Sequence, residues 1–337
     1  MTFSSRTAAP ADRTGAGDEL AISARGLARS FRTRGRVVEA VRGVDLAVHQ
    51  GEIAGFLGPN GAGKTTTLRM LTTLLRPTAG EAEVAGCDLR ADPAGVRRRI
   101  GYVAQGGTVE PACTVIEELT LQGRLYDLSA AEATRRAHDL LARLDLDGLA
   151  GRLVRTLSGG QRRRLDIALG LVHRPGLVFL DEPSAGLDPQ SRANLWDHVQ
   201  GLRRDGATVF LTTHYLEEAD ALCDRILVID AGRIVAEGTP DELKRTVSGD
   251  VITVAVVGSA EPARAAVAGA VRGVRDVTVR GTDLLLTVEQ GEVALVGVLR
   301  ALDAAGIEIA SVAVARPSLD DVFLTVTGRS LRDEPEA

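Results

Sequence analysis

Lysine is almost absent from this chain, because only Lys64 and Lys244 among its 337 residues are lysines. Aromatic side chains make up only 3% of the residues. No stretch approaches the ~20 consecutive apolar residues that a membrane-spanning helix needs, so a second polypeptide would have to cross any membrane at which this chain works. The three cysteines, Cys87, Cys113 and Cys223, are far apart and show no metal-ligand spacing, which is typical of a reducing cytoplasm.

The composition is that of a globular protein with a mildly acidic balance of charge. Hydrophobic residues make up 45% and charged residues 25%, and the formal net charge is −5. A dedicated nucleic-acid binder usually carries a basic domain or stripe, so we expect no nucleic-acid partner. Two runs of arginine, Arg97–Arg99 and Arg162–Arg164, are predicted to lie on solvated helix faces.

The larger part of the chain predicts an α/β domain. Short apolar runs alternate with helical patterns over residues 19–245. Ile53–Leu57 and Leu177–Leu180 are almost wholly apolar, as in strands that a mostly parallel sheet buries on both faces. Residues 1–18 are small and polar with no apolar run, which predicts a flexible tail and not a secretory signal.

A composition change after Gly238–Pro240 predicts a second, smaller α+β domain over residues 246–330, followed by a tail at 331–337. A short helix over Asp241–Val247 leads to it. The order β-α-β-β-α-β is ferredoxin-like, with elements expected at Val251–Val257, Glu261–Val271, Val274–Arg280, Asp283–Val288, Gly291–Ala305 and Ile307–Ala315. A last helix is predicted to begin at Ser318, with Asp321 completing a capping box.

A phosphate-binding loop follows the apolar strand Ile53–Leu57 and precedes a helical stretch expected at Thr66–Leu75. It matches G-x-x-x-x-G-K-[ST] at every fixed position. Glycines let successive N–H groups point at an anion, and the helix N-terminus adds its positive dipole end. Lys64 would reach the β- and γ-phosphates, and the Thr65 hydroxyl is the expected Mg²⁺ ligand. The candidate nucleotide-binding residues are Gly58, Pro59, Asn60, Gly61, Ala62, Gly63, Lys64, Thr65 and Thr66.

Two acids, Asp181 and Glu182, end the apolar run Leu177–Leu180. In open α/β sheets, ligands bind at the carboxyl ends of the strands. Asp181 can therefore reach Mg²⁺ directly or through water, and Glu182 is the candidate general base for an attacking water. Two solvated loop acids are the alternative, which the upstream phosphate loop disfavours. Together the two motifs predict a nucleotide hydrolase.

The segment Leu157–Gln161, Leu-Ser-Gly-Gly-Gln, resembles the signature sequence of the ABC ATPase family. Ser158 follows Lys64 by 94 residues and is a good N-cap for a helix that starts there. Further landmarks of the family fall in order along residues 20–240. Gln105 in Tyr102–Gln105 resembles the Q-loop glutamine, Asp188 in Ser184–Asp188 the D-loop aspartate, and His214 after Val209–Thr213 the H-switch histidine.

Phe31 lies where the family usually has a tyrosine that stacks on adenine, and its ring would keep that stacking. A lone aromatic residue is equally expected in a core, and His214 could also be a structural histidine. If the resemblance holds, His214 contacts the γ-phosphate and orients water, while Gln105 contacts Mg²⁺ and the lytic water. The catalytic residues implied are Glu182, His214, Gln105 and Lys64; the metal ligands are Thr65, Gln105 and Asp181; and the further nucleotide-binding residues are Phe31, Ser158, Gly159, Gly160, Gln161 and Asp188.

The resemblance implies a fold and an assembly. The fold is a P-loop NTPase cassette with a mostly parallel core sheet and a helical subdomain at about 106–160. Two chains would pair head to tail and hold two ATP molecules, each covered by Ser158 and Gly160 of the other chain. Closing on ATP and opening after hydrolysis would drive a separate membrane permease, placing the chain at the cytoplasmic face of the membrane.

Two segments narrow the resemblance to drug exporters of the daunorubicin/doxorubicin-resistance ATP-binding protein family. They are Ser158–Ala168 and Ser318–Leu324. Export of lipid, polysaccharide or ions by the same motor remains an alternative. A soluble ABC ATPase acting on DNA or ribosomes is disfavoured by the short interval between Lys64 and Ser158 and by the single cassette. A small-molecule kinase would leave the signature and His214 without a role.

Overall fold

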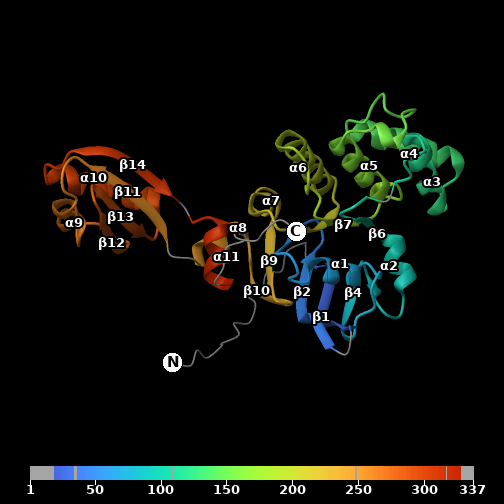
Figure 1. Ribbon diagram of the computed structural model, residues 1–337, viewed down its shortest axis with the longest axis horizontal. Helices are drawn as coiled ribbons and strands as arrows, with labels where there is room; N and C mark the ends of the chain where they lie inside the picture. Colours follow the sequence, from blue (N-terminus) through green and yellow to red (C-terminus); the bar gives the residue numbers. More distant parts are fainter. Residues whose placement is uncertain (1–18, 34–35, 108, 247–248, 316, 328–337) are drawn as a thin grey trace.

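The computed structural model describes residues 19–33, 36–107, 109–246, 249–315 and 317–327, and the predicted tails at 1–18 and 331–337 lie outside these ranges. Figure 1 shows a large α/β unit and a smaller unit set apart from it, with α8 and α11 between the two. Within the described ranges, no helix is both long enough and apolar enough to cross a bilayer.

A six-stranded sheet forms the centre of the large unit. Its order is β10-β9-β3-β8-β7-β6, with β10 antiparallel at one edge and the other five strands parallel. Every residue of the three central strands β3, β8 and β7 is buried, as their apolar sequences predict. The predicted mostly parallel sheet is therefore confirmed, with strands β3 (Ile53–Leu57), β6 (Ile100–Val103), β7 (Leu177–Asp181), β8 (Thr208–Thr213), β9 (Arg225–Asp230) and β10 (Arg233–Gly238).

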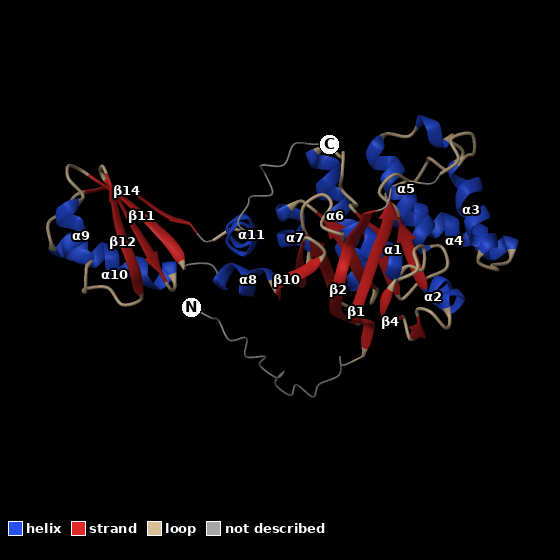
Figure 2. Ribbon diagram, turned by 60° about the horizontal axis from the view of Figure 1, so that its bottom comes forward, coloured by secondary structure: helices blue, strands red, loops and turns tan. Residues whose placement is uncertain are grey.

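A second, antiparallel sheet lies beside the first, in the order β2-β1-β4-β5. Its strands are β1 (Leu20–Thr33), β2 (Arg36–His49), β4 (Ala79–Val84) and β5 (Cys87–Asp88), and α2 (Pro93–Arg99) follows them. Figure 2 shows α1 (Lys64–Leu71) behind the strands of this sheet. Leu68, Met70 and Leu71 of α1 are fully buried in one core with residues of both sheets. This packing fixes the direction of the helix that carries Lys64 and Thr65.

Helix α1 differs from its prediction at both ends, because it covers Lys64–Leu71 and not Thr66–Leu75. It begins directly at the lysine, with left-handed Gly63 as its N-cap. It ends where Thr72 Oγ1 donates to the backbone oxygen of Leu68 and where Thr73 has a positive φ of 64°.

A group of helices lies to one side of the two sheets (Figure 1), with α5 (Gly159–Leu171) packed against β6 and with α3 (Val115–Leu125) and α4 (Ala130–Arg143) packed against α5; the short turn Val154–Thr156 precedes α5. The helices α3, α4 and α5 each begin with a capping box, in which an N-cap hydroxyl and the third helical residue bond each other's backbone N–H groups. The helices α6 (Pro189–Arg204) and α7 (Leu216–Leu222) follow β7 and β8. The starts of α3, α4 and α5 are thus set by local sequence.

The smaller unit has the predicted β-α-β-β-α-β order and one antiparallel sheet, β12-β13-β11-β14. Its core contains one face of that sheet and of the two helices. The elements are β11 (Asp250–Val256), α9 (Glu261–Val267), β12 (Val274–Arg280), β13 (Asp283–Val288), α10 (Gly291–Ala304) and β14 (Ile309–Ala315). The end of α9 and the start of β14 differ from the prediction by two or more residues, and the ends of β11 and the end of α10 differ by one.

Backbone hydrogen bonds at the helix ends explain these differences. Helix α9 stops at Val267, four residues early, because Ala268 is extended and Ala270 N–H bonds back to the Val267 oxygen. Strand β14 begins at Ile309 and not at Ile307, because Ile307 N–H bonds the Leu302 oxygen at the end of α10. β11 is shifted by one residue at each end.

The last helix, α11 (Leu319–Thr327), begins with the predicted capping box, in which Ser318 N–H and Oγ both donate to Asp321 Oδ2. It packs against α8 (Pro240–Thr246), the helix predicted at Asp241–Val247, whose last residue lies outside the described ranges. Its buried residues Leu319, Val322 and Phe323 belong to the core of the large unit. The domain boundaries assigned from sequence stay a prediction.

Candidate functional site

The loop between β3 and α1 is buried at both of its ends. Gly58, Pro59, Ala62 and Gly63 are buried, while Asn60 and Gly61 at its tip are exposed. Gly63 adopts a φ of 107°, and a Cβ there would come 2.6 Å from the Ala40 oxygen. Only glycine fits that position, so the sequence motif is explained by a close backbone approach. Thr66 follows, half-buried in the first turn of α1.

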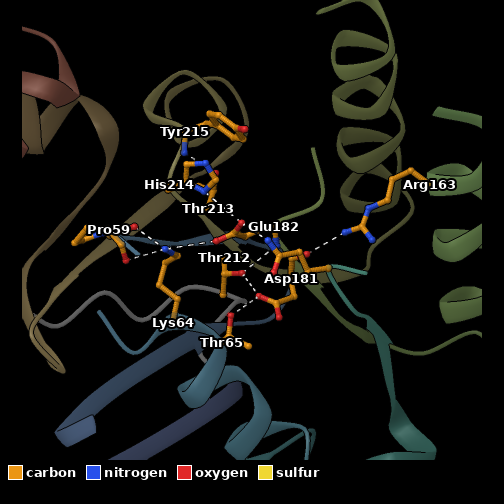
Figure 3. Close-up of polar contacts among 12 residues, drawn as sticks. Pro59, Lys64, Thr65, Arg163, Asp181, Glu182, Thr212, Thr213, His214 and Tyr215 are labelled. Atoms are coloured by element: carbon orange, nitrogen blue, oxygen red, sulfur yellow. Dashed lines mark hydrogen bonds and ion pairs between the residues drawn. The ribbon is translucent and has the colours of Figure 1, made fainter. Parts of the chain in front are cut away.

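Lys64 is the only buried lysine that the described residues contain, with 5% of its surface exposed. Its ammonium group donates to the backbone oxygens of Gly58 (2.7 Å) and Pro59 (3.0 Å), so it folds back over its own loop (Figure 3). It also lies 3.6 Å from Glu182 Oε1. A desolvated cation in a cradle of N–H groups offers a site for an anionic phosphate chain.

Asp181 is buried at the end of β7, where two hydroxyl groups meet one of its oxygens. Thr65 Oγ1 donates to Asp181 Oδ1 at 3.1 Å, and Thr212 Oγ1 donates to the same oxygen at 2.6 Å. Three elements, α1, β7 and β8, therefore bring oxygen ligands to one point. Thr212 was not singled out from the sequence; the polar pair Thr212–Thr213 at the end of an otherwise apolar strand was the available signal.

Glu182 lies in a strained backbone conformation, with a φ of +43° that costs a non-glycine residue ~1–3 kcal/mol. Its backbone N–H contacts both Thr212 O and Thr212 Oγ1 at 3.1 Å. Gln105 Nε2 donates to its Oε2 at 2.7 Å, and His214 Nδ1 lies 3.3 Å from the same oxygen. The structure thus gathers Lys64, Gln105 and His214 around one carboxylate.

These neighbours set the protonation state of Glu182. Burial would raise the pKa of its carboxyl group, but the contacts with His214 and the charge of Lys64 outweigh burial and hold the pKa below its usual range. The carboxylate is therefore ionised at neutral pH and can accept a proton. A base that is charged, buried and aimed by three side chains is suited to activating a water molecule.

The remaining predicted residues form two helix ends. Ser158 Oγ accepts the N–H of Gln161, and Gln161 Oε1 accepts the N–H of Ser158, leaving Ser158 and Gly159 exposed and Gly160 half-buried at the start of α5. Asp188 caps α6 by accepting from Ser191 N–H and Oγ, which lower the pKa of its carboxyl group. The start of α5 is therefore an exposed helix N-terminus, whereas α6 begins with Pro189, which has no N–H, and Asp188 accepts from the N–H of Ser191.

Phe31 lies on β1 opposite Val38 of β2, and its ring is half-buried. The guanidinium carbon of Arg29 stands 4.7 Å from the ring centroid. Phe31 is not one of the buried core residues, so the alternative that it packs in the core is wrong. Its predicted contact with adenine stays a prediction.

Arg163 corrects the prediction for the second arginine run. Arg162 is exposed and Arg164 half-buried, but Arg163 is only 7% exposed. Its guanidinium donates to three backbone oxygens, those of Ala104 (2.6 Å), Pro183 (2.8 Å) and Asp181 (3.0 Å). Burial lowers the pKa of Arg163, and the negative charges of Asp166 and Asp181 oppose that shift. The guanidinium stays protonated, because an arginine side chain is not deprotonated in proteins. The run Arg97–Arg99 is exposed, as predicted.

Comparisons with known proteins identify relatives of both units. A family model described as "ABC transporter" matches residues 41–185, and one described as "ATP-binding protein DrrA1-3-like, C-terminal domain" matches residues 238–327. The chain is 49% identical to daunorubicin resistance ATP-binding protein DrrA3 of Streptomyces coeruleorubidus, over 87% of this chain and 93% of the relative. It is 44% identical to doxorubicin resistance ATP-binding protein DrrA of Mycobacterium tuberculosis, over 92% and 94%.

Two further matches are a relative named for export and a solved structure. Nod factor export ATP-binding protein I of Cupriavidus metallidurans is 40% identical over 87% of this chain and 94% of its own length. Among solved structures, a dimeric post-hydrolysis state of the ATP-binding cassette MJ0796 bound to ADP and Pi has a TM-score of 0.60 at 26% identity. That match covers 65% of this chain and 98% of the other chain.

Proposed function

The chain belongs to the ATP-binding proteins of ABC transporters and is an ATPase, and from that premise we propose that it powers export of a hydrophobic drug through a separate membrane permease. The observation that carries the proposal is the Glu182 carboxylate, contacted by Lys64, Gln105 and His214 beside a phosphate-binding loop. Names of two relatives refer to drug resistance, which supports the choice of cargo.

We assign a role to each residue around Glu182. Glu182 accepts the proton of the attacking water, which Gln105 and His214, both in contact with Oε2 of the carboxylate, orient. Lys64 turns from the oxygens of Gly58 and Pro59 toward the β- and γ-phosphates when nucleotide enters. The loop N–H groups and the start of α1 stabilise the negative charge on the leaving phosphates.

The oxygen ligands at the end of β7 suit Mg²⁺, which prefers hard oxygen donors and is held by one or two carboxylates plus phosphates. Thr65 Oγ1 and Asp181 Oδ1 already converge at 3.1 Å, and Gln105 would add an amide oxygen. When bound, the ion neutralises charge on the phosphates. Thr212 then holds the carboxylate of Asp181 through its 2.6 Å hydrogen bond.

We propose that two chains pair head to tail, so that Ser158 and Gly160 of one chain cover the ATP of the other. The exposed N-terminus of α5 supports this arrangement, because the N–H groups and the dipole at a helix start favour an anion. One matching solved structure is described as dimeric. Loss of the γ-phosphate removes contacts shared by both chains, so the pair opens and moves the permease at the cytoplasmic face of the membrane.

Export of another cargo is a second candidate, favoured by the 40% identity to a Nod factor export protein. Inside-out membrane vesicles carrying the chain and its permease would distinguish the two. We expect ATP-dependent uptake of daunorubicin, abolished when the chain carries Glu182→Gln. ATP hydrolysis without daunorubicin uptake would contradict drug export and leave the motor itself intact. If no membrane protein co-purifies with the tagged chain from detergent extracts, the proposal that the chain works with a separate permease is wrong.

Replacement of Phe31 tests its assignment to the adenine ring. Phe31→Ala is expected to lower ATP affinity about 5- to 150-fold, because stacking a base on an aromatic ring is worth ~1–3 kcal/mol. Phe31→Tyr keeps the ring and should bind ATP like the unsubstituted chain. Both affinities can be measured with a fluorescent ATP analogue. Equal affinity for the alanine and tyrosine variants would show that Phe31 does not stack on the base.

A further inference from the structure

Arg163 connects three segments of the site that are far apart in sequence. It lies in the first turns of α5, one residue beyond the exposed Arg162. Its Nη1 donates to the oxygen of Ala104, the residue before Gln105. Its Nε and Nη2 donate to the oxygens of Pro183 and Asp181, which flank Glu182 on either side. All these contacts are with backbone, so they act on the position of the chain.

The backbone at Glu182 needs such support. Its φ of +43° is unfavourable for a residue with a side chain, and such a conformation persists only when surrounding contacts hold it. Thr212 holds the backbone N–H of Glu182, and Arg163 holds the carbonyl groups before and after it. The direction of the Glu182 side chain, and hence its 2.7 Å contact with Gln105, depends on this backbone.

A second side chain of α5 contacts the segment after Gln105. A Cβ at Gly107, whose φ is +67°, would stand 3.0 Å from Asp166 Oδ2, so the Asp166 side chain lies close to this segment and glycine suits the position. Asp166 Oδ2 also lies 4.0 Å from Arg163 Nη1. Thus α5 bonds the residue before Gln105 through Arg163, and its Asp166 side chain lies close to the segment after Gln105.

We propose that Arg163 is a positioning residue that holds Glu182 and Gln105 in register with the helix that begins at Ser158. The inference rests on the proposed function and deepens it. A planar guanidinium with donors fixed in a fork can hold three carbonyl groups at once, which a lysine ammonium on a flexible stem does less well. Placement of Ser158 on a partner's nucleotide is thereby linked to alignment of the base in the same chain.

The test compares Arg163→Met, Arg163→Lys and the exposed neighbour variant Arg162→Met in the full chain. Arg163→Met should lower kcat for ATP hydrolysis about 10- to 30-fold, within the ~10²-fold that a 1 Å misplacement of a reacting group can cost. The KM and the affinity for ATP should stay within about 2-fold, because the contacts do not involve nucleotide. Arg163→Lys should be intermediate, and Arg162→Met should match the unsubstituted chain.

The same substitution in the Glu182→Gln variant distinguishes positioning of Glu182 from a general weakening of the fold. If Arg163 acts through Glu182, Arg163→Met should have less than about a 2-fold further effect on single-turnover hydrolysis in Glu182→Gln, since effects within one unit are not additive. An equal loss in both backgrounds, or normal kcat in Arg163→Met, would overturn the inference. Should Arg163→Met fail to fold, Arg163→Lys carries the same comparison. Absence of hydrolysis by the unsubstituted chain would overturn the proposed function as well.

Discussion

Replacing Glu182 with glutamine is expected to lower kcat for ATP hydrolysis by ~10²–10⁴-fold while ATP still binds, the range that one general base contributes. The substitution keeps the size of the side chain and its contact distance to Gln105 Nε2, which is 2.7 Å in the native chain. It removes the proton acceptor and the negative charge beside Lys64. ATP would then persist between two chains, so the variant should accumulate as a dimer in the presence of ATP.

Steady-state phosphate release and size-exclusion chromatography with and without ATP measure the two effects. Glu217→Gln is a matched control, because that carboxylate is 82% exposed on α7 and lies 4.0 Å from Arg192, away from Glu182. The control should hydrolyse ATP like the unsubstituted chain. Turnover by Glu182→Gln at the native rate would show that another group accepts the proton.

Replacing Lys64 with alanine is expected to lower ATP affinity by about 10²-fold, in line with the ~1.5–3 kcal/mol that hydrogen bonds to charged groups contribute. The phosphates lose a cation that has already been desolvated beside Gly58 and Pro59. The pKa of Glu182 should also rise, because Lys64 is one of the two groups that hold it low. The variant would therefore bind ATP weakly. At acidic pH a larger fraction of Glu182 would be protonated and unable to accept the proton of water.

The only other lysine offers the control. Lys244 lies on α8, where its ammonium group contacts Asp220 at 2.5 Å on the surface. Lys244→Ala removes the same charge from the chain and should leave the affinity for a fluorescent ATP analogue unchanged. If both variants bind the analogue equally well, the assignment of Lys64 to the phosphates is wrong.

Features that depend on neighbouring residues could be predicted from the sequence. The phosphate loop requires glycine at Gly63 because of a positive φ of 107°, which belongs to a local turn, although the close contact that also excludes a Cβ is with Ala40 on strand β2. The capping boxes at Ser158 and Ser318 involve residues three positions apart. Buried parallel strands carry an unbroken apolar signal, so Ile53–Leu57 was placed correctly to the residue.

Helix ends were less predictable, because small changes in the backbone decide whether a residue continues the helix or makes a hydrogen bond that ends it. The sequence between Val267 and Val271 is apolar enough to continue a helix, yet Ala268 turns away into an extended conformation. Ile307 is an apolar residue that would suit a strand, but its N–H completes the end of α10. Apolar pattern alone does not distinguish these outcomes.

Sequence by itself determined the parts of the site that lie within short segments: the phosphate loop, the acids at the end of β7 and the helix that starts after Ser158. Only the tertiary structure decided that Gln105 and Glu182, 77 residues apart, meet at 2.7 Å. It also decided that Arg163 is buried between exposed and half-buried neighbours. The physical reason is that a charged residue reads as solvated from sequence, whereas the carbonyl groups that make its burial favourable come from Ala104, Asp181 and Pro183, which only the fold brings together.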